Sequence, residues 1–188
     1  MPESATWLGG WAIPPKWALS ILEKHFPGQT HEWLPPTAQN LAVAKPSAAY
    51  SLGASLLLLK NQDSGASLFA PFFDFKKEAG QGGKVARAQL LYVRKWLRRD
   101  PIAALNDFYQ TSGIPLEISG LPYLEADLLW GIDQLLEDVP IPEIPVQAKA
   151  TFGTQDALLD ASTLPGLFEN PTIVQGASHN LDELLTKA

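Results

Sequence analysis

Three residues of this sequence have the types and the chain order of a catalytic triad. Ser51 comes first, Asp156 follows a predicted strand over 146–152, and His179 follows a predicted strand over 172–174. A serine hydroxyl is a poor nucleophile until a histidine accepts its proton. The histidine in turn needs a carboxylate that fixes its tautomer and stabilises its charged form. The sequence therefore predicts acyl transfer on Ser51, with His179 as the base and Asp156 as the acid.

The residues around Ser51 are those of a tight corner between a strand and a helix. Residues 49–53 read A-Y-S-L-G, close to the pattern G-x-S-x-G, and four leucines follow at 56–59. A nucleophile at such a corner needs small neighbours, because the strand and the helix approach each other closely there. A buried strand followed by a core helix would give the same local pattern. The later Asp156 and His179 favour the catalytic interpretation.

The chain contains other residues of the types that a triad needs. Asp74 follows a predicted strand over 66–70 and is the alternative to Asp156 as the acid. His25 and His31 both precede the serine, and we expect them to be a cation at the end of a helix and a strand residue.

A glycine-rich loop after the first predicted strand is a candidate oxyanion hole. Residues 5–8 are expected to form that strand, Gly9 and Gly10 follow it, and Pro14-Pro15 opens a helix. Such a loop leaves backbone N–H groups free to face an anion, and the residue after the nucleophile supplies a second N–H. We expect the N–H groups of Trp11 and Leu52 to hold the oxyanion. The alternative is that the two glycines only make the turn.

Composition and the order of elements set the fold class. Strands alternate with helical segments, which indicates an α/β fold with a mostly parallel sheet of about six strands. The 188 residues suit one domain of ordinary size, and the absence of cysteine excludes disulfides and thiolate sites. There is no secretory signal pattern and no apolar run of about 20 residues. We therefore expect a cytoplasmic protein that contacts no membrane.

Residues 76–137 are predicted to form a helical cap inserted into a core made of 1–75 and 138–188. Helices are expected at 84–99, from 101 to 113 and at about 121–136. The proline-rich run 139–145 cannot be helical and is expected to return the chain to the sheet as an extended connection.

Positive charge is concentrated at the start of this cap. Residues 76–99 contain eight basic residues and one acidic residue, while the rest of the chain is strongly acidic. On a helix the cations would gather along one side, which predicts a surface for an acidic partner rather than for nucleic acid. A solvated helix face is the plainer alternative. The predicted partner-binding residues are Arg87, Arg94, Lys95, Arg98 and Arg99.

Taken together, these motifs resemble the α/β-hydrolase superfamily and, within it, the pimeloyl-[acyl-carrier protein] methyl ester esterases of biotin synthesis. Residues 10–12 (G-W-A) are similar to the family's G-W-G oxyanion loop, and residues 50–53 (Y-S-L-G) to its W-S-L-G elbow. Residues 131–135, 153–156 and 177–179 are similar to the segments before and around its acid and histidine. Ala49 and Ala54 depart from the family, in which glycines are common at these positions.

The resemblance implies an α/β-hydrolase fold and a serine carboxylesterase that needs no metal or organic cofactor. Its substrate would be pimeloyl-[acyl-carrier protein] methyl ester, which is cleaved to pimeloyl-carrier protein and methanol, and the cap arginines would grip the acyl carrier protein. One alternative is an acyl-carrier-protein thioesterase, and another is a general short-chain carboxylesterase. The alternative from another class is a non-catalytic module of this fold that binds an acidic partner through the cap.

Overall fold

Strands and helices alternate along the chain in the computed structural model, which describes residues 4–60, 65–140 and 146–186. The strands are β1 Ser4–Leu8, β2 Thr30–Leu34, β3 Ala48–Tyr50, β4 Ser67–Phe69, β5 Lys149–Gly153 and β6 Thr172–Val174. The helices are α1 Pro15–His25, α2 Ala38–Val43, α3 Leu52–Leu59, α4 Arg87–Leu97, α5 Pro101–Ser112, α6 Glu125–Leu136 and α7 Leu181–Thr186. Two short 3₁₀ turns, η1 Lys77–Ala79 and η2 Leu164–Leu167, complete the described elements.

The strands form one sheet in which every pairing is parallel. Their order is β2-β1-β3-β4-β5-β6, so β1 lies between β2 and β3 and the direction of winding reverses there. In open α/β sheets a crevice for ligands opens at the carboxyl ends of the two strands beside such a reversal. The loops after β1 and β3 contain Trp11 and Ser51. The prediction of a parallel sheet of about six strands is confirmed.

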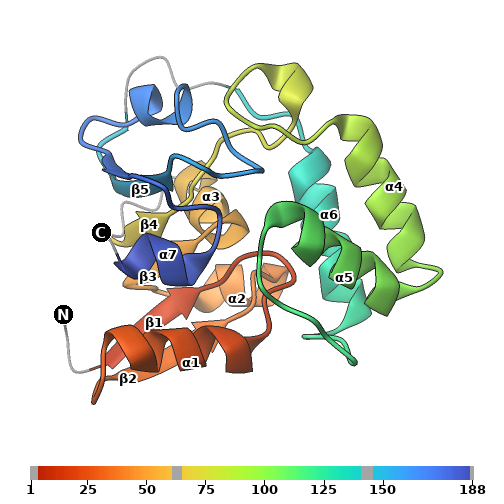
Figure 1. Ribbon diagram of the computed structural model, residues 1–188, viewed down its shortest axis with the longest axis horizontal. Coiled ribbons are helices and arrows are strands. Elements are labelled where there is room, and N and C mark those ends of the chain that lie inside the picture. The colour runs from red at the N-terminus through yellow and green to blue at the C-terminus, as the bar shows by residue number, and fades with distance from the viewer. Residues whose placement is uncertain (1–3, 61–64, 141–145, 187–188) are drawn as a thin grey trace.

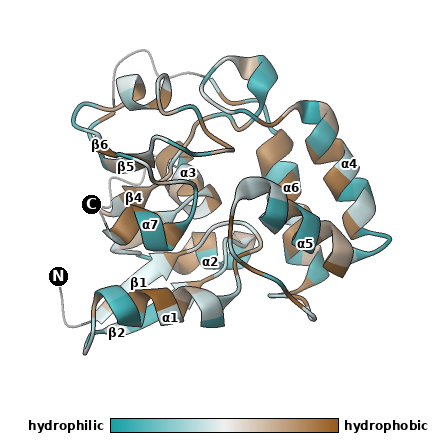
Figure 2. Ribbon diagram, in the orientation of Figure 1, coloured by the Kyte–Doolittle hydropathy of each residue, from teal (hydrophilic) through white to brown (hydrophobic). Residues whose placement is uncertain are grey.

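Helices cover both faces of the sheet. Helices α1 and α7 contact each other on one face, and α2 and α3 contact each other on the opposite face (Figure 1). Figure 2 shows hydrophilic and hydrophobic residues alternating around α1, α4, α5 and α6, as expected when one side of a helix faces a core and the other faces water. No helix in the described part of the chain combines the length and the hydropathy needed to cross a bilayer.

Between β4 and β5 the chain forms η1, α4, α5 and α6, which lie beyond the carboxyl ends of the strands (Figure 1). Asp100 caps α5 as its sequence suggests, because its carboxylate accepts the N–H of Ala103 at 3.2 Å and Pro101 takes the first helical position. Helices α4 and α6 are tied together by the ion pair between Arg94 and Asp133.

Three predicted boundaries in this part of the chain differ from the structure. Helix α4 begins at Arg87 rather than at 84, because the N–H of Lys84 bonds to Leu158 and Val85 bridges to Lys76. Helix α6 begins at Glu125 rather than at 121, and strand β5 spans 149–153 rather than 146–152. Residues 141–145 of the predicted extended connection lie outside the described residues.

Candidate active site

Ser51 lies at a strained corner between β3 and α3. Its backbone has φ 52° and ψ −120°, a conformation that costs a residue with a side chain roughly 1–3 kcal/mol. The corner is held on both sides, since the N–H of Ser51 donates to Phe69 at 2.8 Å and its carbonyl accepts the N–H of Ser55 at 3.0 Å. The strain directs the side chain away from both elements, as a nucleophile elbow requires.

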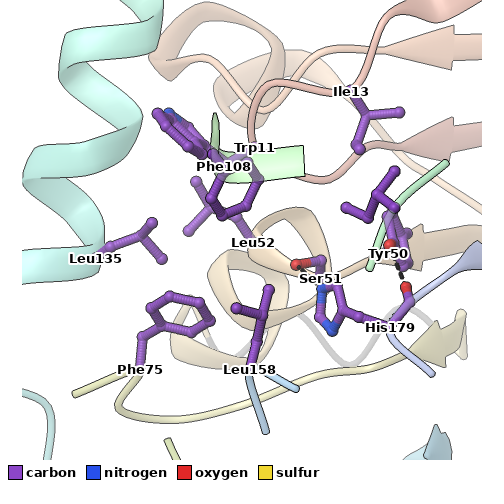
Figure 3. Close-up of a pocket in the computed structure, with 11 residues that line it drawn as sticks. Trp11, Ile13, Tyr50, Ser51, Leu52, Phe75, Phe108, Leu135, Leu158 and His179 are labelled. Carbon is purple, nitrogen blue, oxygen red and sulfur yellow. Dashed lines mark hydrogen bonds between the residues drawn. The ribbon is translucent and has the colours of Figure 1, made fainter. Parts of the chain in front are cut away.

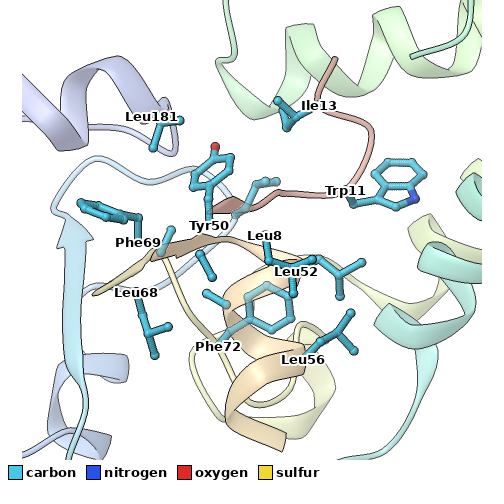
Figure 4. Close-up of a cluster of buried hydrophobic side chains, with 14 of the residues drawn as sticks. Leu8, Trp11, Ile13, Tyr50, Leu52, Leu56, Leu68, Phe69, Phe72 and Leu181 are labelled. Carbon is cyan, nitrogen blue, oxygen red and sulfur yellow. The ribbon is translucent and has the colours of Figure 1, made fainter. Parts of the chain in front are cut away.

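Gly53 allows the helix after the corner to pack against the end of β1. A Cβ on Gly53 would lie 2.5 Å from the carbonyl oxygens of both Leu8 and Gly9, a distance that no side chain tolerates. The surrounding core is mainly apolar (Figure 4), with Leu52, Leu56 and Phe72 on one side of the sheet and Tyr50, Phe69 and Leu181 on the other. This packing explains why the elbow needs a glycine at the fifth position of the pattern.

The side chains of Ser51, His179 and Asp156 form a continuous hydrogen-bonded chain (Figure 3 shows the first two). Nε2 of His179 lies 2.9 Å from Oγ of Ser51, and Nδ1 lies 2.7 Å from Oδ2 of Asp156. An ionised carboxylate can only accept, so Nδ1 bears the proton and Nε2 is free to accept from the hydroxyl. Exposed fractions of 8% for Ser51, 2% for His179 and 3% for Asp156 leave little water to compete.

The other carboxylate oxygen of Asp156 is fixed by its own loop. Oδ1 accepts the N–H groups of Leu158 and Leu159 at 2.8 and 3.0 Å. The ammonium of Lys84 donates to the backbone carbonyl of Asp156 at 2.6 Å and so ties this loop to the segment before α4. Backbone and side-chain donors therefore fix Asp156 independently of its contact with His179.

Asp74 and the other two histidines lie in different contacts. The carboxylate of Asp74 accepts Nζ of the buried Lys76 at 3.0 Å and the N–H of the same residue at 2.8 Å. Nε2 of His25 contacts Asp182 at 2.6 Å, and both ring nitrogens of His31 lack a partner among the described residues. The structure thus brings Asp156, and not Asp74, to His179.

The two predicted oxyanion donors both line the pocket at Ser51. Within the described residues, no acceptor is bonded to the N–H of Trp11 or to that of Leu52, which is the first residue of α3 and has no partner inside the helix. The indole of Trp11 lies against α6, where a Cβ on Gly131 would be 2.4 Å from the ring. Its Nε1 donates to the carbonyl of Leu128 at 2.9 Å.

Tyr50 links the elbow to the histidine, a contact that the sequence does not reveal. Its ring lies 5.4 Å from the imidazole of His179, and its hydroxyl donates to the backbone carbonyl of the same residue (Figure 3). Burial raises the pKa of the Tyr50 phenol, and the negative charge of Asp156 raises it further, so the hydroxyl stays neutral. No local sequence pattern predicts this contact, because Tyr50 and His179 lie 129 positions apart.

Space for a substrate is divided into a small pocket and a larger cavity. The pocket at Ser51 has room for about one water, with a volume of about 10 Å³. The cavity beside it measures about 520 Å³ and lies among α4, α5 and α6. Five residues line both spaces, namely Trp11, Phe75, Phe108, Leu135 and Leu158. The small pocket at Ser51 and the larger cavity therefore share part of their walls.

The predicted partner-binding residues divide into two groups. Arg94 makes a two-pronged pair with Asp133, Nε to Oδ1 at 2.5 Å, and Arg87 lies 3.7 Å from Asp138. Lys95, Arg98 and Arg99 are exposed at the end of α4 and have no ion pair with any described residue. The basic surface that is free for a partner is therefore formed by these last three residues, named here the α4 basic end.

Metal ligands do not gather anywhere in the described part of the chain. His, Asp and Glu side chains nowhere form a group of three that could hold a metal ion.

A parallel sheet with helices on both faces, and a serine at a strained corner after its third strand, define the α/β-hydrolase fold. Three solved structures share this fold at low sequence identity. An esterase from Exiguobacterium antarcticum has a TM-score of 0.62 and 11% identity, and the match covers 93% of this chain and 85% of that one. BioG from Haemophilus influenzae has a TM-score of 0.61 and 12% identity, over 97% of this chain and 90% of BioG. A hydrolase from Oleispira antarctica has a TM-score of 0.57 and 11% identity, over 97% and 85%.

Comparison of sequences alone finds no such likeness. No protein-family model matches the chain, and no curated protein matches it significantly in sequence. The likeness is therefore one of fold, and what the chain does must be argued from its own site.

Proposed function

We propose that this protein is a serine carboxylesterase, with Ser51 as nucleophile, His179 as general base and acid, and Asp156 as the orienting carboxylate. The observation that supports it most is the bonded series from Ser51 Oγ through the imidazole to Asp156, at 2.9 and 2.7 Å. A buried serine at a strained φ, beside two N–H groups that have no acceptor among the described residues, has the arrangement that acyl transfer needs.

The reaction proceeds in two steps. His179 takes the proton of Ser51 as Oγ attacks the carbonyl carbon of the ester, and the N–H groups of Trp11 and Leu52 hold the resulting oxyanion. The bond to the alcohol oxygen then breaks as His179 returns the proton to it. Water, deprotonated by His179, attacks the acyl-enzyme, releases the acid and restores Ser51. The buried site keeps the charged intermediate away from bulk water.

The substrate has an acyl group long enough to occupy the larger cavity. The walls of this cavity are mainly apolar, with Phe108, Ile132 and Leu135 among the lining residues. The volume of the cavity falls within the range of small-molecule sites. Hydrophobic burial of the chain in this cavity would position the ester carbon at Ser51.

Filling the cavity is expected to discriminate against long acyl chains. Ala88 of α4 lines the cavity, and Ala88→Trp places an indole inside it. We expect kcat/KM for p-nitrophenyl octanoate to fall roughly tenfold or more, with less than about threefold loss on p-nitrophenyl acetate. Ala126→Trp, at an exposed position of α6 that lines neither space, is the matched control. Equal losses on both esters would place the acyl chain elsewhere.

We further propose that the ester is presented by an acyl carrier protein that docks on the α4 basic end. Three cations that have no ion pair within the described ranges lie at the end of α4, on a chain whose net charge is −6. An acidic protein would gain charge-assisted contacts there, and its association would be steered and sensitive to salt. This is the substrate class implied by the resemblance to the esterases of biotin synthesis, and it rests mainly on the features of the cap.

Reversing charge on the α4 basic end separates a carrier-bound substrate from a small one. Arg98→Glu combined with Arg99→Glu is expected to raise KM for a carrier-bound ester about tenfold at 0.1 M salt, with p-nitrophenyl acetate turnover unchanged. Lys60→Glu with Lys149→Glu makes the same charge change at exposed sites away from the cap and should leave both substrates unaffected. If the two double variants behave alike, the cations form only a solvated helix face.

Product analysis identifies the bond that is cleaved. Incubation with methyl-pimeloyl carrier protein is expected to release methanol and leave pimeloyl-carrier protein. Release of free carrier instead would make the protein a thioesterase that uses the same Ser51. Absence of both products, with p-nitrophenyl esters still hydrolysed, would leave a general short-chain carboxylesterase.

A further inference from the structure

The turn that presents the N–H of Trp11 contains a residue in an unfavourable conformation. The N–H of Ile13 closes the turn on the carbonyl of Gly10 at 3.4 Å, and Ala12, at the third position, has φ 64°. Trp11, at the second position, is not among the residues with positive φ, so the pattern of signs is that of a type II turn. The third position of such a turn strongly favours glycine, because a Cβ is crowded there.

Two tyrosines from the segment between β4 and β5 hold Ala12 in this conformation. The hydroxyl of Tyr123, just before α6, accepts the N–H of Ala12 at 2.7 Å. The hydroxyl of Tyr109, on α5, donates to the carbonyl of Ala12. These contacts join residues that lie 111 and 97 positions apart, and Ala12 itself is fully buried.

Both hydroxyls are suited to hold a neutral peptide. Burial raises the pKa of Tyr109 and of Tyr123, so neither phenol ionises at any pH at which the protein would work. One donates and the other accepts, and together they fix the N–H and the carbonyl of the same residue. The residue before Ala12 is fixed as well, because the indole Nε1 of Trp11 donates to the carbonyl of Leu128 at 2.9 Å.

Without these bonds the turn has an easier alternative. In a type I turn the peptide between the second and third residues is turned over, and the third residue keeps a negative φ that alanine adopts readily. That flip would put the carbonyl of Trp11 where the N–H of Ala12 now meets Tyr123. The N–H of Trp11 belongs to the preceding peptide and does not turn over itself, so the flip would reach it by displacing the backbone of Trp11, which lines the pocket.

We propose that Tyr109 and Tyr123 are positioning residues that hold the Gly10–Ile13 turn in the form that presents the N–H of Trp11 to the oxyanion. The proposal rests on the proposed esterase function and extends it to residues that touch no substrate atom. It also accounts for alanine at a position that favours glycine, since the two hydroxyls offset the crowding of its Cβ.

The test is the variant Tyr123→Phe, alone and combined with Ala12→Gly. We expect Tyr123→Phe to lower kcat for p-nitrophenyl acetate about 10–100-fold while KM changes less than about threefold, because the N–H of Trp11 that Tyr123 helps to position acts on the transition state. Adding Ala12→Gly should recover at least about tenfold of kcat, since glycine adopts the positive φ without help. Tyr109→Phe is expected to behave in the same way.

A trifluoromethyl ketone supplies a readout that a purely structural role would not change. Oγ of Ser51 adds to its carbonyl carbon, the proton passes to His179, and the ketone oxygen becomes an oxyanion in the hole. Its Ki should rise by the same factor by which kcat falls. Ser112→Ala removes another buried hydroxyl bond on α5 and serves as the control, with Ki unchanged even if the melting temperature falls.

The outcomes separate this inference from the esterase function itself. Unchanged kcat and Ki in folded Tyr123→Phe and Tyr109→Phe would overturn the positioning role, and so would a loss that Ala12→Gly does not recover. The esterase function is judged separately, by whether wild-type turnover disappears in Ser51→Ala. An inactive Ser51→Ala beside fully active tyrosine variants would remove only the inference about the turn.

Discussion

Replacing Ser51 by alanine is expected to lower kcat/KM for p-nitrophenyl acetate by about 10⁴–10⁶, the largest effect of any single substitution in this protein. The nucleophile is lost while His179 and Asp156 remain, so no acyl-enzyme can form. His179→Ala should cause a loss of similar size, since the hydroxyl without its base is no better than water. Steady-state rates and labelling by a fluorophosphonate measure this directly, and Ser51→Ala should take up no label.

Ser51→Gly provides a control in which activity and stability are expected to change in opposite directions. Glycine adopts the φ of 52° without the crowding that a Cβ imposes, so this variant should be as inactive as Ser51→Ala but more stable by about 1 kcal/mol. A gain of a few degrees in melting temperature would show that the corner stores strain for function. Near-normal turnover in either folded variant would remove Ser51 from the mechanism.

The second large effect is expected at Asp156 and is best measured beside Asp74. Asp156→Asn presents an amide to Nδ1 of His179 and favours the wrong tautomer, so kcat should fall about 10⁴-fold. The amide oxygen can still accept the N–H groups of Leu158 and Leu159, and the fold should survive. The measurement is kcat at full folding, verified by circular dichroism.

Asp74→Asn should instead lower the stability of the fold and leave kcat nearly unchanged. Its carboxylate pairs with the ammonium of Lys76, and both side chains are almost fully buried. Breaking a buried pair by neutralising one member typically costs about 3–5 kcal/mol, part of which Asp138 would offset here because it also lies 3.2 Å from Lys76. We therefore expect a clear loss of stability with kcat within about tenfold of wild type. If Asp74→Asn lost most of its kcat while Asp156→Asn kept it, the roles assigned to the two acids would have to be exchanged.

Features that depend on near neighbours along the chain could be predicted from the sequence. Alternating strands and helices predicted the parallel sheet, and A-Y-S-L-G at 49–53 predicted a corner that the structure places between β3 and α3. The reason is that strand periodicity, helix caps and close approach at a small residue act over a few positions of the chain. The order of Ser51, Asp156 and His179 was visible for the same reason, because each follows its own strand.

Contacts between groups that lie far apart in the chain could not be predicted, because they depend on the packing of separate elements. Sequence left both Asp74 and Asp156 as possible acids, and the fold brings Asp156 to His179 while Lys76 takes Asp74. The predicted partner-binding surface contains fewer free cations than expected for the same reason, since Asp133 on a different helix pairs with Arg94. The hold of Tyr109 and Tyr123 on Ala12 had no local signal either. Each of these contacts depends on how separate elements pack, and neither spacing nor propensity along the chain specifies that packing.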